Sequence, residues 1–196
     1  RRRIEPAAVR EILAYGIESG AEVMVLGYTT LYIYRPNNGE MMRKYESAFR
    51  ALDDSQLELH FSDTLDEMHA ACADDTEKID FALSVHEGIE DIWDKLNAIT
   101  EVEITSSVPG NMEVSAKDGT KQNAISVLAD IYGIDAENIM AIGDNFNDMS
   151  MIMWAGIGVA MGNADDRLKK MANQVTGRNY EGGVAQAIYE LVLNKA

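Results

Sequence analysis

The chain has 196 residues, of which 46% are hydrophobic and 26% are charged, and its formal net charge at pH 7 is −16. These values are typical of a globular protein with one large or two small domains. The negative charge disfavours binding to nucleic acids and anionic membranes, and no apolar run reaches the roughly 18 residues needed to cross a bilayer. A small phosphorylated substrate remains compatible, because a metal ion and a local Lys can reverse the field inside one pocket.

The chain begins Arg1-Arg2-Arg3 and contains one cysteine, Cys72. No apolar segment with a small-residue cleavage site follows the arginines, so we predict no signal peptide. A single cysteine cannot form an internal disulfide, which favours a reducing compartment, and we expect the cytoplasm. We expect Cys72, in the Ala-rich stretch 70–73, to be a packed side chain and not a nucleophile.

The first half predicts an α+β layer without a catalytic motif. Residues 5–19 predict an amphipathic helix, because Pro6 suits a first turn, apolar residues recur at helical spacing and Gly20 follows. We expect further helices at 41–50 and 88–99, and strands at 21–26, 30–34, 57–61, 79–85 and 102–106. Tyr28, Tyr32 and Tyr34 could line a substrate surface or pack in the core.

The second half alternates short apolar strands with helices, which predicts a doubly wound parallel α/β sheet. We expect strands at 112–115, 139–142 and 156–161, and helices at 121–132, 149–155, 165–172 and 183–193. The wholly apolar segment 139–142 is typical of a parallel strand buried on both faces. We place the domain boundary at Ser107-Val108-Pro109-Gly110, which gives domains 1–107 and 108–196.

An acidic cluster follows the apolar strand, in the sequence Gly143-Asp144-Asn145-Phe146-Asn147-Asp148. Ligands of open α/β sheets bind at the carboxyl ends of the strands, where Asp144 would project. Two carboxylates at such a point suit Mg²⁺, which takes oxygen ligands and usually only one or two carboxylates. Asp148 or Asn147 could instead cap the next helix, but capping accounts for one residue and not for the whole set.

Residues 143–149 resemble the fourth motif of the haloacid dehalogenase superfamily. Residues 155–164, Ala-Gly-Ile-Gly-Val-Ala-Met-Gly-Asn-Ala, are similar to the segment that follows this motif in its Cof-type sugar-phosphatase group. The similarity continues at Lys169, Ala172, Val175-Thr176 and Gly183-Val184-Ala185. The resemblance implies that 108–196 form the C-terminal part of a doubly wound core, and that 1–107, whose α/β pattern resembles the family's cap, are an α+β cap domain.

The resemblance also implies roles for individual residues. In the family, a Lys that opens the helix after the third motif stabilises the transferring phosphoryl group, which implies a catalytic role for Lys121. Asp144 and Asp148 would bind Mg²⁺, and Asn147 would orient a metal-bound water or the nucleophile. Asn163, in the Gly-Asn-Ala turn, is expected to shape its loop. Phosphoryl transfer depends mainly on placement and electrostatics, which suits this set of groups.

The sequence lacks the family's first motif, an apolar strand ending in Asp-x-Asp-Gly, and its second, a strand ending in Ser or Thr. The first Asp would form an aspartyl-phosphate and the second would act as general acid and base. We therefore expect this segment to lie N-terminal to Arg1, and we expect the chain alone to hydrolyse no phosphate ester. Strands 139–142 and 156–161 would lack neighbours and expose apolar edges.

The resemblance implies a Mg²⁺-dependent phosphatase of small phosphomonoesters, in particular sugar phosphates. From the charge and the lack of a long apolar run, we expect no nucleic-acid or membrane partner. The alternative is a non-catalytic module that binds ligands or dimerises. A P-type cation pump shares the Gly-Asp-x-x-Asn-Asp motif, but pumps need membrane helices after it. The sequence leaves the identity of the substrate and the oligomeric state open.

Overall fold

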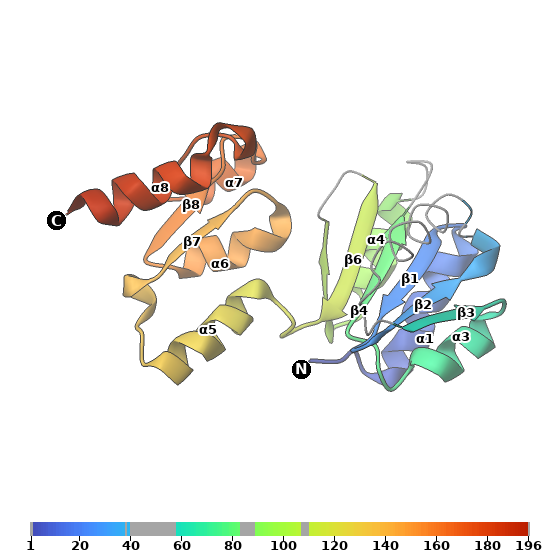
Figure 1. Ribbon diagram of the computed structural model, residues 1–196. Coiled ribbons are helices and arrows are strands. Elements are labelled where there is room, and N and C mark those ends of the chain that lie inside the picture. The colour runs from blue at the N-terminus through green and yellow to red at the C-terminus, as the bar shows by residue number, and fades with distance from the viewer. Residues whose placement is uncertain (1, 38, 40–57, 83–88, 107–109, 196) are drawn as a thin grey trace. The chain divides into compact units, whose positions relative to one another are not determined.

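The chain divides into two compact units, Arg1–Gly119 and Thr120–Ala196, in a computed structural model (Figure 1). The structure describes residues 2–37, 39, 58–82, 89–106 and 110–195. The helix predicted at 41–50 lies outside these residues. Within the described part of the chain, no helix combines the length and the apolar character needed to span a membrane.

The first unit contains a six-stranded sheet with the strand order β3-β2-β1-β4-β6-β5. The strands are β1 (Glu22–Leu26), β2 (Thr30–Tyr34), β3 (Glu58–Ser62), β4 (Lys78–Ala82), β5 (Val102–Thr105) and β6 (Asn111–Ala116). Strands β2 and β3 are parallel, and the other neighbouring pairs are antiparallel. The strands predicted at 21–26, 30–34, 57–61 and 102–106 are confirmed within one residue at each end, as is the start of the one predicted at 79–85.

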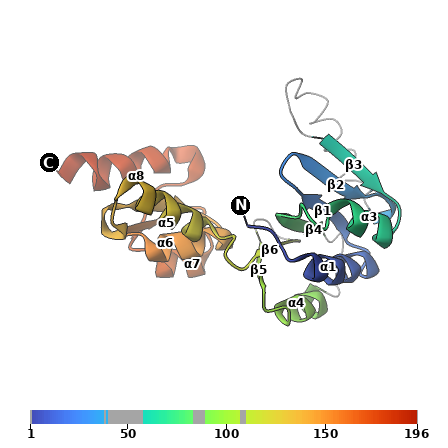
Figure 2. The same cartoon turned by 90° about the horizontal axis from the view of Figure 1, so that it is seen from below.

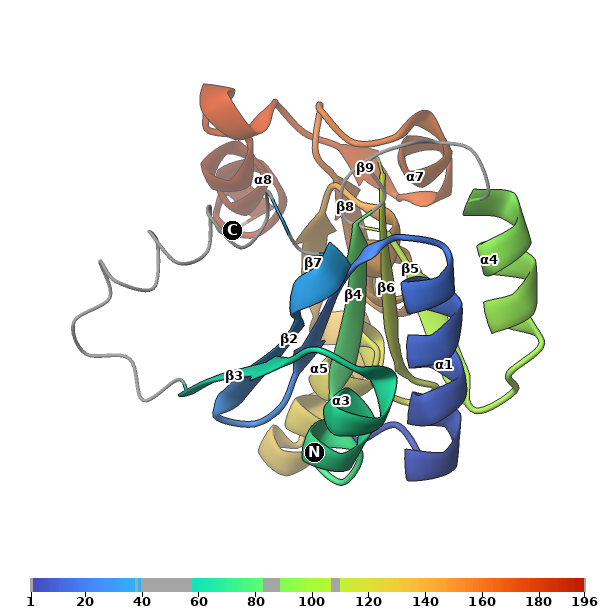
Figure 3. The ribbon, with the colours of Figure 1, turned by 90° about the vertical axis from the view of Figure 1, so that its right-hand side faces the viewer.

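Helices α1 (Pro6–Glu18), α3 (Leu65–Cys72) and α4 (Ile89–Asn97) lie on one face of this sheet (Figures 2 and 3). Helix α1 has Pro6 in its first turn and is followed by Gly20, whose φ of 75° favours glycine. The main core lies between helices and sheet and includes Val9, Ile12, Leu13, Val23, Val25, Met68, Ile79, Phe81 and Val114. The helical pattern predicted over 5–19 is thereby confirmed.

Helix α3 was not predicted from the sequence, although the stretch carries a capping box. The Thr64 hydroxyl oxygen accepts a hydrogen bond from the Glu67 backbone N–H at 3.2 Å, and the Glu67 carboxylate accepts one from the Thr64 N–H at 3.2 Å. This reciprocal pair satisfies two N–H groups at the helix start. The Thr-x-x-Glu spacing before Met68 is the pattern that could have revealed this helix.

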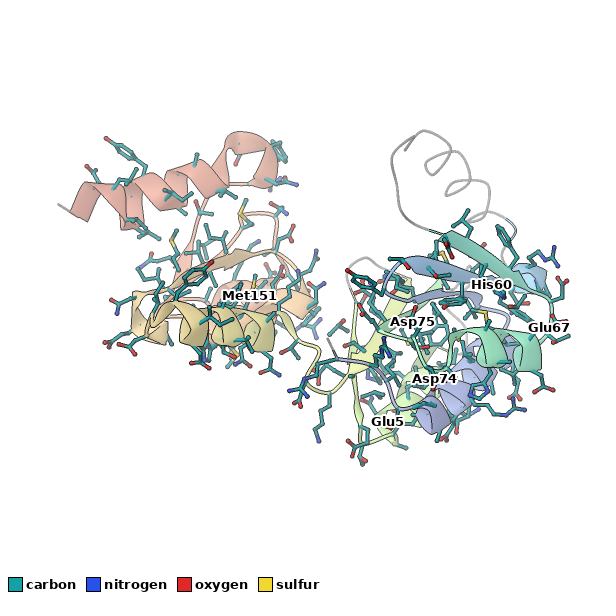
Figure 4. All side chains as sticks on the ribbon, turned by 60° about the horizontal axis from the view of Figure 1, so that its bottom comes forward. Glu5, His60, Glu67, Asp74, Asp75 and Met151 are labelled. Atoms are coloured by element: carbon teal, nitrogen blue, oxygen red, sulfur yellow. The ribbon has the colours of Figure 1, made fainter. Side chains whose placement is uncertain are left out.

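Two of the three tyrosines that could have lined a substrate surface pack in the core. Tyr32 and Tyr34 are buried against the helices, whereas Tyr28 is exposed. Asp75, labelled in Figure 4, accepts hydrogen bonds from the Tyr28 backbone N–H and from the Tyr32 hydroxyl, at 3.1 and 3.3 Å. The carboxylate therefore ties the β1–β2 turn to the segment between α3 and β4. The opposite face of the sheet carries a smaller cluster of Met24, Leu31 and Ile33.

The boundary between the units lies further along the chain than the sequence predicted. Strand β6, which was assigned to the second half, pairs with β4 and β5 of the first sheet. Residues 107–109 of the predicted boundary lie outside the described residues, and the division of the chain falls after Gly119. Gly and Pro occur in many kinds of connection, so composition alone did not locate the division.

The second unit has a three-stranded parallel sheet in the order β7-β8-β9. Its elements are α5 (Lys121–Tyr132), β7 (Met140–Gly143), α6 (Met149–Trp154), β8 (Ile157–Ala160), α7 (Asp166–Met171), β9 (Gln174–Val175) and α8 (Gly183–Leu191). All four predicted helices and the strands at 139–142 and 156–161 are confirmed, and β9 is additional. The core contains Ala141, Ile152, Ala160 and Leu168, with the partly buried Trp154 against them.

The prediction that both strands lack neighbours is wrong for β8, which lies between β7 and β9. Among the described residues, β7 pairs with β8 alone. Large apolar side chains are exposed on α5 and on α8 and its C-terminal end, namely Val127, Leu128, Ile131, Tyr132, Val184, Ile188, Tyr189, Val192 and Leu193. Helices α5 and α8 of the second unit thus each expose several large apolar side chains.

We predict that Cys72 is unreactive in the folded chain. Its side chain is fully buried, and burial raises the pKa of the thiol to about 11. Because the thiolate is the nucleophile, iodoacetamide at pH 8 should leave the native chain unmodified and should modify it in 8 M urea, as mass spectrometry would detect. Native modification at the rate of a free cysteine would contradict the prediction.

Candidate active site

The site residues predicted from the sequence meet at one edge of the parallel sheet. Gly143, the last residue of β7, pairs with Ala160, the last residue of β8, and Ala160 also pairs with Val175 at the end of β9. The loops that follow the three strands therefore start at the same carboxyl edge. This is the edge at which open α/β sheets bind ligands.

The carboxylate of Asp148 holds the loop after β7 in place. Its Oδ2 accepts hydrogen bonds from the backbone N–H groups of Asp144 and Asn145, at 2.9 and 3.1 Å. Asp148 is only 4% exposed, so the negative charge needs these partners in place of water. The buried carboxylate thus fixes the backbone of the residue that projects Asp144.

Gly143 is required for this close approach. A Cβ atom at residue 143 would lie 2.4 Å from the Asp148 Cβ and 2.6 Å from its Oδ2. Any side chain at this position would push the Asp148 carboxylate away from the two backbone N–H groups that donate hydrogen bonds to it. The glycine of the Gly-Asp motif is therefore explained by packing.

Lys121 brings a positive charge to the same carboxylate from the start of α5. Thr120 caps this helix, and its side chain accepts a hydrogen bond from the Asn123 backbone N–H at 3.1 Å. The Lys121 Nζ lies 2.5 Å from Asp148 Oδ1 and 3.5 Å from Asn147 Oδ1. The Lys121 side chain is 51% exposed, so the ammonium is tethered on one side and open on the other.

Asp144 is half-buried, and each of its carboxylate oxygens accepts one side-chain amide hydrogen bond. Asn145 Nδ2 donates to Oδ1 at 3.1 Å, and Asn163 Nδ2 donates to Oδ2 at 2.9 Å. A carboxylate has about four lone-pair sites, so two such bonds leave acceptor capacity for a cation. Asp144 is thus oriented and still able to bind.

A cation–π contact supports the same loop from α7. The Arg167 guanidinium carbon lies 4.1 Å from the centroid of the Phe146 ring. The Asp165 side chain caps α7 and accepts a hydrogen bond from the Arg167 backbone N–H at 2.8 Å. This hydrogen bond lowers the pKa of the Asp165 carboxyl. The contact was not predicted, because the two residues are far apart in the sequence and no motif links them.

The structure brings Lys121, Asp144, Asn147 and Asp148 together in one connected group. The carboxylate and amide oxygens of this group are ligands that suit a hard divalent ion, and the group contains no sulfur. Among the described residues, no three or more His, Cys, Asp or Glu side chains form a group that could hold a metal ion by themselves. A Mg²⁺ ion held by one or two carboxylates, with waters and a substrate phosphate as its remaining ligands, fits this donor set.

Comparison with known families finds a match over nearly the whole chain. Residues 1–188 match the family described as haloacid dehalogenase-like hydrolase. Among curated proteins, the 5-amino-6-(5-phospho-D-ribitylamino)uracil phosphatase YcsE of Bacillus subtilis is 45% identical over 103 residues, which are 53% of this chain and 41% of that protein. The matched segments span 29% to 41% of the lengths of this and seven other curated relatives.

Solved structures match both units. A haloacid dehalogenase-like hydrolase from B. subtilis has a TM-score of 0.81 and 27% identity, covering 97% of this chain and 72% of that one. A haloacid dehalogenase subclass IIB sugar phosphatase has a TM-score of 0.79 and 24% identity, covering 97% of this chain and 68% of that one. At that identity the second likeness supports the fold alone, which is the α/β class predicted from the sequence.

We predict that the two motif aspartates differ in their effect on stability. Asp148→Ala should lower the free energy of unfolding of the second unit by about 2–3 kcal/mol, because it leaves two part-buried N–H groups without their acceptor and Lys121 without its buried partner. Asp144→Ala should lower it by less than about 1 kcal/mol, because its partners are side chains that can turn to water. Urea unfolding followed by Trp154 fluorescence, in a Trp93→Phe background, measures both values.

Asp166→Ala is the matched control, since Asp166 is an exposed carboxylate in the same unit with an ion pair to Lys169 at 3.6 Å. Its removal should change the free energy of unfolding by no more than about 0.5 kcal/mol. If Asp144→Ala and Asp148→Ala lowered the free energy of unfolding equally, the conclusion that Asp148 holds the loop after β7 in place would be contradicted.

Proposed function

Because this chain belongs to the haloacid dehalogenase-like hydrolases, we propose that it forms part of a Mg²⁺-dependent phosphatase of the Cof-type sugar-phosphatase group. The proposed reaction is hydrolysis of a small phosphomonoester through an aspartyl-phosphate. The observation that carries the proposal is the joint position of the Lys121 ammonium and the Asp144 carboxylate, linked by Asp148 at the carboxyl edge of the sheet. Relatives named as phosphatases support the same reaction class.

Lys121 is proposed as the catalytic cation. A transferring phosphoryl group spreads negative charge over its oxygens, and a fixed positive charge at that point lowers the barrier. The Asp148 carboxylate at 2.5 Å holds the ammonium on one side, while its exposed side is free to meet a phosphoryl oxygen. With a formal net charge of −16, the chain would need such a local cation to receive an anionic substrate.

Asp144 is proposed as the direct ligand of Mg²⁺, which when bound would neutralise charge on the phosphoryl oxygens. Asp148, predicted as a second ligand, already uses Oδ2 for two backbone N–H groups and Oδ1 for Lys121. Only a further lone pair of Oδ1 would be left for the metal, so its main proposed role is to position Asp144 and Lys121. Asn147, with its Oδ1 at 3.5 Å from Lys121 Nζ, is proposed to orient a metal-bound water or the nucleophile.

The substrate class and the location are proposals of the same kind. The curated relative from B. subtilis is named for a phosphorylated ribityl compound, which supports a sugar phosphate or similar small phosphomonoester. The first unit is proposed as the cap whose side chains choose among such substrates. The reducing cytoplasm is proposed as the location, supported by the single buried cysteine.

The proposal is tested by comparing the 196-residue chain with the same chain extended by its upstream coding sequence. The nucleophile of the family lies in an Asp-x-Asp-Gly strand, so the chain alone should release no nitrophenol from nitrophenyl phosphate. The extended chain should release nitrophenol in the presence of Mg²⁺, and the release should stop when EDTA removes the metal. Lys121→Met and Asp144→Asn should each lower kcat of the extended chain by about 100-fold or more.

Lys170→Met is the matched control, because Lys170 is an exposed lysine of the same unit on α7. It should leave kcat within about twofold, as expected for a solvated surface charge. An upstream sequence without Asp-x-Asp-Gly, or an extended chain that binds phosphate esters without turnover, would instead favour the non-catalytic binding module. Turnover by the 196-residue chain that Asp144→Asn abolishes would overturn the need for an upstream nucleophile.

A further inference from the structure

The Asn163 side chain makes two hydrogen bonds at the carboxyl edge of the sheet. Together they connect the loops that follow β7, β8 and β9. Asn163 Nδ2 donates to Asp144 Oδ2 at 2.9 Å, and Asn163 Oδ1 accepts the backbone N–H of Asn179 at 2.9 Å. A backbone N–H can only donate, so it determines which end of the Asn163 amide is oxygen. The NH₂ end is then the one that faces the carboxylate.

The two amides that contact Asp144 differ in where they come from. Asn145 belongs to the same loop as Asp144 and would move with it. Asn163 belongs to the loop after β8, so its bond fixes the carboxylate relative to the neighbouring strand. Within the described part of the chain, the Asn163 amide is thus the side chain that ties the Asp144 carboxylate to the loop of another strand.

The backbone around Asn163 is itself held on both sides. The Met161 N–H donates to the Gly143 carbonyl at 2.9 Å, and the Gly162 N–H donates to the Gly177 carbonyl at 3.0 Å. The loop that carries Asn163 is thus fastened to the end of β7 and to the segment after β9. The Asn163 side chain is exposed, so these backbone bonds and its own two hydrogen bonds are what hold the amide at Asp144.

We infer that Asn163 is a positioning residue for a divalent cation at Asp144, and that the Asn179 backbone N–H sets its orientation. The inference rests on the proposed function. Asn163 would hold the Asp144 carboxylate in one rotamer with its remaining lone pairs directed at the ion. Hydrogen-bond partners of metal ligands commonly contribute about 10–100-fold in metal affinity. The sequence predicted only that Asn163 shapes its loop, and that role would leave metal affinity unchanged.

The test measures binding of Mn²⁺ alone, as a probe for Mg²⁺, to the full 196-residue chain. The dissociation constant is obtained from paramagnetic broadening of the Asp144 and Asn145 backbone amide signals in NMR spectra. Asn163→Ala should raise this constant about 10–100-fold, and Asp144→Ala should abolish the broadening at this site. Trp154 unfolding curves, recorded in the Trp93→Phe background, report separately on stability.

A pair of substitutions at Asn179 isolates the orienting N–H. Asn179 is the first residue of a 3-10 helix, and the preceding Arg178 is extended with φ −73° and ψ 162°, so Pro fits the backbone here. Asn179→Pro removes the N–H that Asn163 accepts, whereas Asn179→Ala keeps it and removes the side chain. Asn179→Pro should weaken Mn²⁺ binding several-fold, and Asn179→Ala should not. Combining Asn163→Ala with Asn179→Pro should weaken binding no further than Asn163→Ala does.

The outcomes separate the inference from the proposed function. Specific broadening in the unchanged chain, lost or weakened in Asn163→Ala and Asn179→Pro, supports both. Broadening that is equal in the unchanged chain and in Asn163→Ala overturns the inference, and a lower unfolding midpoint in that variant then assigns Asn163 to loop shape. If the unchanged chain shows no broadening at Asp144, the proposed metal site is wrong, and the inference is overturned with it.

Discussion

The buried carboxylate of Asp148 is the interaction on which the candidate site depends. It accepts hydrogen bonds from the backbone N–H groups of Asp144 and Asn145, which follow β7, and it contacts the ammonium of Lys121, the first residue of α5. One side chain therefore connects the end of a strand to the start of a helix. A charge so poorly exposed is tolerated only with several partners, which makes the arrangement cooperative. Gly143 is part of the same constraint, because its missing Cβ provides the space that the carboxylate occupies. The loop geometry and the lysine position therefore have one common origin.

Parallel pairing extends this constraint across the sheet. Because β7, β8 and β9 end in register, Asp144, Asn163 and the Asn179 backbone approach one another although they are separated by up to 35 positions. Amide and ammonium donors therefore surround the two carboxylates in a chain with a formal net charge of −16. The local balance of donors and acceptors, and not the overall charge, determines what this edge of the sheet can bind.

Much of this structure could be predicted from the sequence, because the relevant patterns are local. Apolar periodicity identified α1 and α5, and short apolar runs identified β7 and β8. The Gly-Asp-x-x-Asn-Asp spacing singled out Asp144 and Asp148 as candidate site residues. Helix α3 was missed because a short capped helix resembles a loop in composition. The division after Gly119 was missed because Gly and Pro occur in many kinds of connection. The contacts of Asn163 with Asn179 and of Arg167 with Phe146 depend on strand register, which a single sequence does not contain.

The shared register of the three strands also has a consequence for how the chain can tolerate changes in length. An added or deleted residue in the segments 144–148, 161–165 or 176–179 would shift one partner of a hydrogen bond while its counterpart stayed in place. The left-handed turn at Gly133, which follows α5 and leads toward the amino end of β7, makes no such contact among the described residues. Variation in chain length, whether natural or introduced to attach a label, is therefore best accommodated at that turn, where it leaves the carboxyl edge of the sheet unchanged.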